Sequence, residues 1–194
     1  MTRRDIIRNA ALAAAVGAAT SASGQHVHEA VQEEKTGGPY KVKAFNDHEW
    51  ATLRRLCELV IPADNQSKGA LDGNAPEYID LLSSNNPELA SRITGGLAWL
   101  DNEARRRYGS ADLLSAGPDK QTALLDLIAY RKNESPALGP GIRFFDLARR
   151  MIVDAFYTSP AGVEAVGYKG NQAVSHFEVP TAAIEYALKR SGLG

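Results

Sequence analysis

Residues able to do chemistry are few in this chain, which has four histidines and a single cysteine. His26 and His28 offer two metal ligands, but two histidines alone make a poor site, and a solvated stretch is the simpler interpretation. Cys57 follows His48 by nine residues, which puts the two on opposite faces of a helix and leaves the thiol without a base. We therefore expect a buried, inert thiol, no catalytic residue and no metal site.

Known cofactor motifs are also missing from the sequence. The stretch 63–74 is rich in Asp, Asn and Gly, but it lacks the ligand spacing of a calcium loop. There is no Glu-x-x-His pair, no Gly-x-Gly-x-x-Gly, no Cys-x-x-Cys-His and no P-loop. We expect no cofactor in this chain, so that any cofactor of its pathway would be held by a partner.

Composition indicates one globular domain. The chain has 194 residues, of which 44% are hydrophobic and 23% charged, so a core of normal size is possible. Its net charge is −1, and without residues 1–23 it has 19 basic and 22 acidic residues and no basic stripe. Nucleic-acid binding is therefore not expected. One cysteine excludes an intrachain disulfide.

The N-terminus has the layout of an export signal. Paired Arg3 and Arg4 precede Ile6, Ile7 and Arg8, a weakly apolar run at 10–19 follows, and small residues end the segment near Ser23. This layout predicts a twin-arginine signal peptide over 1–23, and hence a periplasmic protein. A basic amphipathic helix of a cytosolic protein is the alternative. The polar stretch 24–43 then predicts a flexible linker.

The remainder, 44–194, predicts a compact all-α domain with several helices, because apolar residues recur at steps of three and four and strand alternation is missing. Asn46 is placed to cap the first helix, and Ile61-Pro62 ends it. Proline and glycine then mark the other boundaries. The expected helices run over 47–60, 76–82, 87–108, 118–130, 142–156, 160–166 and 181–189.

The stretch 156–171, FYTSPAGVEAVGYKGN, stands out by its glycines and aromatic residues. It reads either as a helix end with a Gly-rich turn or as a shaped docking surface. Tyrosine is enriched at protein interfaces, and glycine permits unusual backbone shapes. We therefore expect partner binding by five residues of this stretch: Tyr157, Gly167, Tyr168, Gly170 and Asn171.

Two groups of motifs carry a resemblance. LRRLCELVIPAD at 53–64 is followed by Gly-Ala at 69–70 and Tyr-Ile-Asp at 78–80, and FYTSPAG at 156–162 is followed by GYKGN at 167–171. In this order and spacing, over about 45–179, the chain resembles the gluconate 2-dehydrogenase subunit 3 family. The twin-arginine leader is typical of that family, whereas the C-terminal helix at 181–189 departs from its pattern.

The resemblance implies a non-catalytic small subunit of an oxidoreductase complex. Its partner would be a large flavoprotein of the glucose–methanol–choline (GMC) class, holding FAD and oxidising a sugar, a sugar acid or a polyol. A cytochrome c would accept the electrons, and any membrane association would come only through the complex. Family members often supply the export signal for the large subunit and help it to fold. Two alternatives remain: a stand-alone periplasmic metal-dependent enzyme, or a scaffold for another partner.

Overall fold

The computed structural model describes residues 21–168, residue 170 and residues 179–191. Within these ranges the regular structure is helical and contains no strand, which confirms the predicted all-α fold. The α-helices are α2 (Ser21–Lys35), α3 (Asp47–Val60), α4 (Ala75–Ser84), α5 (Pro87–Tyr108), α6 (Pro118–Ile128), α7 (Gly139–Tyr157), α8 (Pro160–Ala165) and α9 (Thr181–Ser191). Short 3₁₀ turns η1 (Leu114–Ala116) and η2 (Arg131–Asn133) flank α6.

Helix boundaries follow from local residues, as the sequence predicts. Asn46 and Glu49 form a capping box at the start of α3, each side chain accepting a hydrogen bond from the other's backbone N–H. Proline stands in the first turn of α4, α5, α6, α7 and α8. Helix α5 ends at Gly109, whose φ of 66° is the left-handed conformation that glycine adopts without strain.

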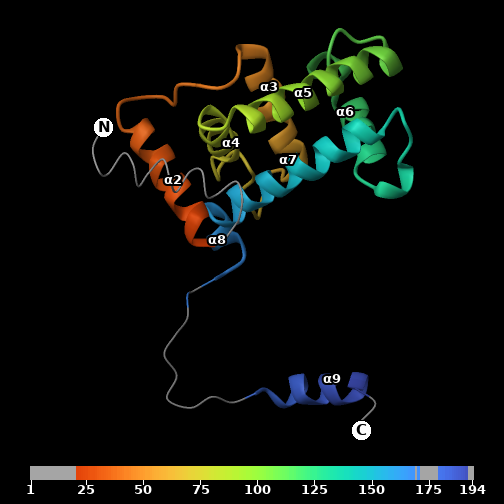
Figure 1. Ribbon diagram of the computed structural model, residues 1–194. Coiled ribbons are helices and arrows are strands. Elements are labelled where there is room, and N and C mark those ends of the chain that lie inside the picture. The colour runs from red at the N-terminus through yellow and green to blue at the C-terminus, as the bar shows by residue number, and fades with distance from the viewer. Residues whose placement is uncertain (1–20, 169, 171–178, 192–194) are drawn as a thin grey trace.

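Helices α5 and α7 pack against each other, the first turns of α7 crossing the middle of α5, and α4 packs against both (Figure 1). Glycines permit the close approach. A Cβ added to Gly96 of α5 would lie 1.8 Å from Cδ2 of Phe144, and one added to Gly141 of α7 would lie 2.3 Å from Cη2 of Trp99. Each helix thus offers a glycine to an aromatic ring of the other, which fixes their relative position.

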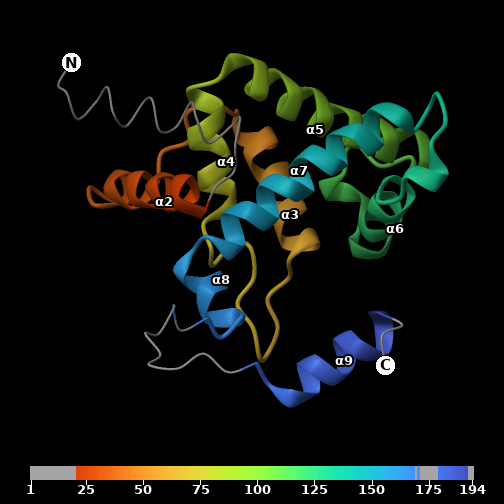
Figure 2. The same ribbon diagram turned by 60° about the horizontal axis from the view of Figure 1, so that its bottom comes forward.

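The predicted flexible linker at 24–43 is wrong for most of its length. Residues 21–35 form α2, which packs beside α4 and α7 (Figure 2). Val27, Ala30 and Val31 are buried, because their spacing of three and one places them on one helix face. The surrounding polar residues lower the average hydrophobicity of the segment and hide this short stripe. Of the predicted leader, residues 1–20 lie outside the described ranges.

The chain between α2 and α3 is held in place by one buried carboxylate. Asp80 of α4 accepts hydrogen bonds from the hydroxyl of Tyr40 at 2.8 Å and from the backbone N–H groups of Lys43 and Ala44 at 2.9 Å each. Three donors satisfy most of the capacity of a carboxylate that has left water. The second half of the predicted linker is therefore fixed to α4 as well.

Other helices differ from the prediction by one to three residues at their ends. Helix α7 begins at Gly139, three residues before the expected start, because Pro140 is compatible with the first turn of a helix. The C-terminal helix is present, as predicted, and extends to Ser191. It stands away from α2–α8 in both views (Figure 1 and Figure 2).

Candidate partner-binding surface

The sharp corner between α7 and α8 carries Tyr157, one of the residues predicted to bind a partner. Phe156 points into the core and is 1% exposed, whereas the neighbouring Tyr157 is 47% exposed. Ser159 caps α8: its hydroxyl donates to the carbonyl of Phe156 at 2.6 Å and accepts from the N–H of Gly162 at 3.1 Å. The buried ring and the cap fix the backbone that presents Tyr157 to solvent.

Close backbone packing explains why glycine is needed inside this corner. A Cβ on Gly162 would lie 2.1 Å from the carbonyl oxygen of Phe156. A Cβ on Gly73, in the turn before α4, would lie 2.9 Å from both the Phe156 ring and the Ser159 hydroxyl. No side chain fits at such distances, so the corner is tightly packed from both sides.

Helix α2 supports the corner from behind through His28. Nε2 of His28 donates to the carbonyl of Ala155 at 2.8 Å and lies 3.1 Å from Oγ1 of Thr158. Burial lowers the pKa of His28, against the opposing effects of the Ala155 carbonyl and the nearby Asp154 carboxylate. The imidazole is therefore held neutral with its proton on Nε2, and it ties α2 to the last turn of α7.

Two further contacts bring distant parts of the chain to the same corner. The hydroxyl of Tyr78 donates to Oδ2 of Asp154 at 2.9 Å, and the pKa of this tyrosine is raised by burial and by the Asp154 charge. Lys68 pairs with Glu164 of α8 at 2.6 Å. The second pair is exposed and contributes little energy, but it places α8 beside the loop that follows α3.

The segment after α8 contains two glycines with left-handed backbone conformations. Gly167 has a φ of 64° and Gly170 a φ of 78°, so both adopt the left-handed conformation that favours glycine. Tyr168 lies between them and is 58% exposed, which excludes it from the core. Gly167, Tyr168 and Gly170 therefore lie together beyond α8, and Tyr157 lies at its other end. Asn171 falls outside the described residues.

Sequence reasoning missed two exposed apolar residues in this region. Val153 precedes Tyr157 by four residues on α7 and so shares its helix face, and Val166 follows α8. Both are exposed. The spacing of Val153 could have been found from the helix period, but Val166 carries no such signal. We call Val153, Tyr157, Val166 and Tyr168 the corner surface.

A groove runs between α3, the loop that follows it, α6 and α7. One part, about 570 Å³, lies between the end of α3 and the loop at 61–72, and a second, about 250 Å³, lies between α3, α6 and α7. Leu59 and Thr122 line both parts, so the two are adjacent. Of the charged groups at the rim, Arg55 pairs with Glu58 at 2.6 Å. These walls offer apolar contact rather than a reactive group.

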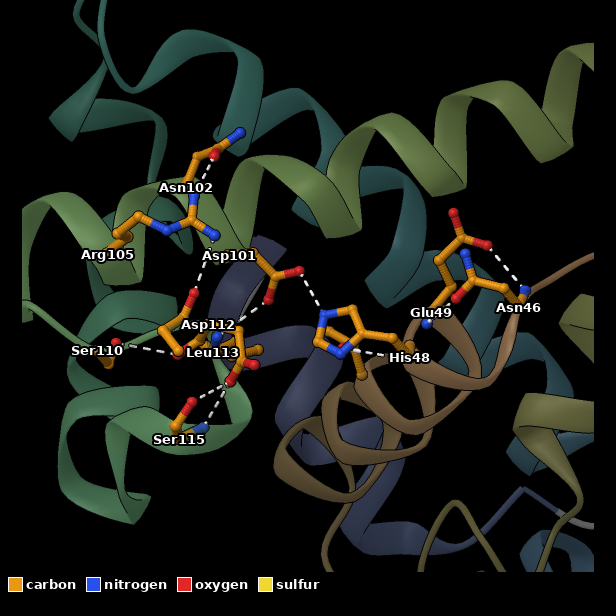
Figure 3. Close-up of polar contacts among 12 residues, drawn as sticks. Asn46, His48, Glu49, Asp101, Asn102, Arg105, Ser110, Asp112, Leu113 and Ser115 are labelled. Carbon is orange, nitrogen blue, oxygen red and sulfur yellow. Dashed lines mark hydrogen bonds and ion pairs between the residues drawn. The ribbon is translucent and has the colours of Figure 1, made fainter.

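The side chains best able to do chemistry, His48 and Cys57, lie away from the corner surface. His48 Nε2 lies 2.8 Å from Oδ2 of Asp101, whose Oδ1 accepts from the N–H of Leu113 at 3.0 Å (Figure 3). The hydrogen bond to Asp101 raises the pKa of His48. Cys57 is fully buried, and burial raises the pKa of its thiol. The structure thus places His48 in a surface clamp between α3 and α5 and Cys57 inside the core.

Clusters of metal-ligating side chains and membrane-spanning helices are absent from the part of the chain that the structure describes. There, no group of three or more His, Cys, Asp or Glu side chains is placed to hold a metal ion. Among the same residues, no helix combines the length and the apolarity that crossing a bilayer requires. Tyr157 and Tyr168 of the corner surface, like Tyr130 and Tyr186 elsewhere, are exposed aromatic residues.

Comparison with protein families gives a match to the model described as gluconate 2-dehydrogenase subunit 3, over residues 47–176. The matched range covers more than half of the chain and runs from the first residue of α3 through the corner surface. The chain belongs to the gluconate 2-dehydrogenase subunit 3 family. Comparisons with curated proteins and with solved structures found no match.

Family membership confirms the resemblance seen in the motifs at 53–80 and 156–171. It makes the chain a subunit of a dehydrogenase complex, with a dehydrogenase as partner. Helix α2 and helix α9 both lie outside the matched range. The matched range therefore covers α3–α8, with the packed helix α2 before it and the exposed helix α9 after it.

Proposed function

We propose that the chain is a non-catalytic accessory subunit for a large FAD-dependent dehydrogenase of the GMC class. It binds the large subunit, assists its folding and escorts it through twin-arginine export to the periplasm. Family membership carries this proposal, because it supplies a dehydrogenase partner for a chain whose sequence contains no cofactor motif. The paired Arg3 and Arg4 provide the twin-arginine export signal in this proposal.

In this proposal the chemistry belongs to the partner. The large subunit holds the FAD and oxidises a sugar, a sugar acid or a polyol, and a cytochrome c receives the electrons. The accessory chain supplies contact area and no reacting group. Its buried thiol fits that division of labour, since the sulfur is not available to a substrate.

The corner surface is suited to binding in physical terms. Its two tyrosines expose large rings, and the Ser159 cap of α8 holds the backbone next to Tyr157. Aromatic residues on a rigid backbone lose little conformational entropy on binding, and such residues dominate the energy of many interfaces. Tyr157 and Tyr168, with Gly167, Gly170 and Asn171 shaping the exit, are therefore the proposed anchors.

The test is purification of the affinity-tagged full chain from its own source. We expect a flavin-containing dehydrogenase to co-purify in a fixed ratio, identified by mass spectrometry and by flavin absorbance. Deletion of the accessory chain should then leave the large subunit unexported and poor in flavin. A large subunit that is exported, flavin-loaded and active in the deletion strain would refute the proposal.

A further inference from the structure

The end of α2 and the turn before α4 bring a lysine, an asparagine and a glutamate into contact. Nζ of Lys35 donates to Oδ1 of Asn74 and, at 3.2 Å, to Oε1 of Glu77. Val27, Val31 and Lys35 follow one another at steps of four, so they share the face of α2 that packs against α4. The amine is therefore held against the carboxamide and the carboxylate by the same packing that buries the two valines.

Asn74 combines an uncommon backbone conformation with an uncommon side-chain partner. Its φ of 55° is left-handed, and no other non-glycine residue that the structure describes has a positive φ. It stands at the N-cap of α4, where an asparagine side chain ordinarily accepts a hydrogen bond from the helix backbone, yet it makes no such bond. Its carboxamide contacts Lys35 instead. A disfavoured conformation without a capping bond points to a role for the side chain itself.

Glu77 is a buried carboxylate with one oxygen that lacks a donor. The residue is 7% exposed, and its Oε1 accepts from Lys35. Oε2 is buried and has no hydrogen-bond partner among the described residues. A buried carboxylate oxygen without a donor is costly, and binding a proton relieves that cost. Glu77 is thus placed to take a proton from the ammonium group of Lys35, which leaves a neutral amine beside the carboxamide of Asn74.

These three groups suffice for an amide exchange. A neutral amine is a nucleophile, and Cγ of Asn74 is one carbonyl bond, about 1.2 Å, from the oxygen that Lys35 contacts. Nζ bonds to Cγ, and the bond between Cγ and Nδ2 breaks. Nδ2 takes the proton held by Glu77 and leaves as ammonia, while Nζ gives its second proton to the same carboxylate. The products are a secondary amide and ammonia, so the reaction needs no oxidant and no further reactant.

We propose that Lys35 and Asn74 form an intramolecular isopeptide bond, with Glu77 as the group that transfers the protons. The inference goes beyond the proposed function and does not depend on any partner. The bond closes a covalent ring from residue 35 to residue 74, which contains the whole of α3 and restricts the unfolded chain as a disulfide does. It also fixes α2, which lies before the family match, to α4 by a covalent link.

The test is the mass of the purified full chain, compared with the mass of its sequence from the N-terminus that peptide mapping identifies. We expect a deficit of one ammonia molecule. Peptide mapping should recover a branched peptide that joins Lys35 to Asn74, and trypsin should fail to cut after Lys35, because its amine is acylated. A mass equal to that of the sequence, in fresh and in aged samples alike, would overturn the inference.

Conservative substitutions separate the covalent bond from the ion pair. Lys35→Arg keeps the positive charge, but a guanidinium group stays protonated and is not a nucleophile. Glu77→Gln keeps the shape of the side chain but cannot take the proton. Both variants should have the full mass and no branched peptide, while circular dichroism shows the helical fold retained.

Lys43→Arg is the matched control, because it makes the same change at a lysine that is also ion-paired, with Glu34 at 2.8 Å. This variant should keep the mass deficit and the branched peptide. A deficit that persists in Lys35→Arg would indicate cyclisation of Asn74 onto its own backbone and would overturn the inference. So would a branched peptide in Glu77→Gln as abundant as in the original chain, as far as the role of Glu77 is concerned.

Discussion

Tyr168 provides the sharpest test at the level of single residues. Because its ring is exposed, Tyr168→Ala should leave the free energy of unfolding within about 0.5 kcal/mol of the original. If the ring is an anchor, the affinity for the dehydrogenase should fall about 30-fold, equivalent to about 2 kcal/mol. Titration calorimetry and thermal melts measure the two quantities. Tyr130→Ala is the matched control, since Tyr130 is comparably exposed, at 56%, in the turn after α6. Equal loss of affinity in both variants would count against the corner surface.

The two structural histidines should give opposite pH dependences. Burial lowers the pKa of His28 below its ordinary value of 6.5, so its contribution to stability is present above that pH and is lost as the pH falls through the folded-state pKa. The partner Asp101 raises the pKa of His48, so its contribution is present below pH 6.5 and is lost as the pH rises through the folded-state pKa.

Denaturant unfolding measures both effects when it is carried out over about three pH units around the ordinary histidine pKa, from about pH 5 to about pH 8. His28→Gln should flatten the loss of stability on the acid side, because the amide can donate to Ala155 without titrating. His48→Gln should flatten the loss on the alkaline side. Unchanged pH profiles in both variants would show that neither side chain is coupled to folding as its contacts indicate.

At the level of elements, the crossing of α5 and α7 depends on Gly96. A methyl group there would meet the buried ring of Phe144, so Gly96→Ala should destabilise the protein by about 1–3 kcal/mol through overpacking. The neighbouring Gly95 meets nothing within 4 Å, and Gly95→Ala should stabilise the helix by about 0.5–1 kcal/mol. Opposite signs for two adjacent, chemically identical substitutions are the expected outcome of chemical denaturation. A loss of similar size at both sites would contradict the described crossing.

Helix α2 can be tested as a packed element in the same way. Val31 is fully buried, and Val31→Ala should lower the free energy of unfolding by about 2 kcal/mol. Val166→Ala makes the same chemical change at an exposed site and should stay within about 0.5 kcal/mol. If Val31→Ala had no effect on unfolding, α2 would be acting as the linker that its composition suggests.

For the whole molecule, the proposed export route predicts that export depends on the two guanidinium groups of Arg3 and Arg4 and not on positive charge alone. Replacing Arg3 and Arg4 together by Lys keeps the charge and removes the paired guanidinium groups. Cell fractionation should then find both this chain and its dehydrogenase in the cytoplasm. Arg8→Lys is the control and should leave export unchanged. Periplasmic amounts unaffected by the double replacement would exclude the twin-arginine route.

Much of the fold could be predicted from the sequence, because its boundaries are set by local chemistry. Pro87, Pro118 and Gly109 act on their own turn of the chain, and the stripe through Leu53 and Cys57 needs only the helix period. Helix α2 was missed because two valines and an alanine among charged residues do not raise its average hydrophobicity. Only the receiving surface on α4 and α7 makes that stripe a buried one.

The candidate site was predictable in part for the same reason. The exposure of Tyr157 follows from its place beside buried Phe156, and the left-handed glycines follow from residue type. The contacts that hold the corner between α7 and α8 in place could not be predicted, because they involve residues far apart in the chain. Glu164 meets Lys68 across 96 positions, and His28 meets Ala155 across 127. No local pattern encodes such pairings, which arise only when the helices have packed.

The burial of Cys57 makes the protein its own unfolding sensor. A thiol at 0% exposure, the only one in the sequence, reacts with an alkylating reagent only in molecules that have opened, so the labelling rate reports the opening equilibrium directly. A bound partner that stabilises the closed form must slow this rate in proportion to its occupancy. Mass spectrometry can follow the reaction in an unmodified chain, without dye, tag or engineered residue. Because the sulfur of Cys57 is buried, the chain cannot form mixed disulfides for as long as α3 stays packed.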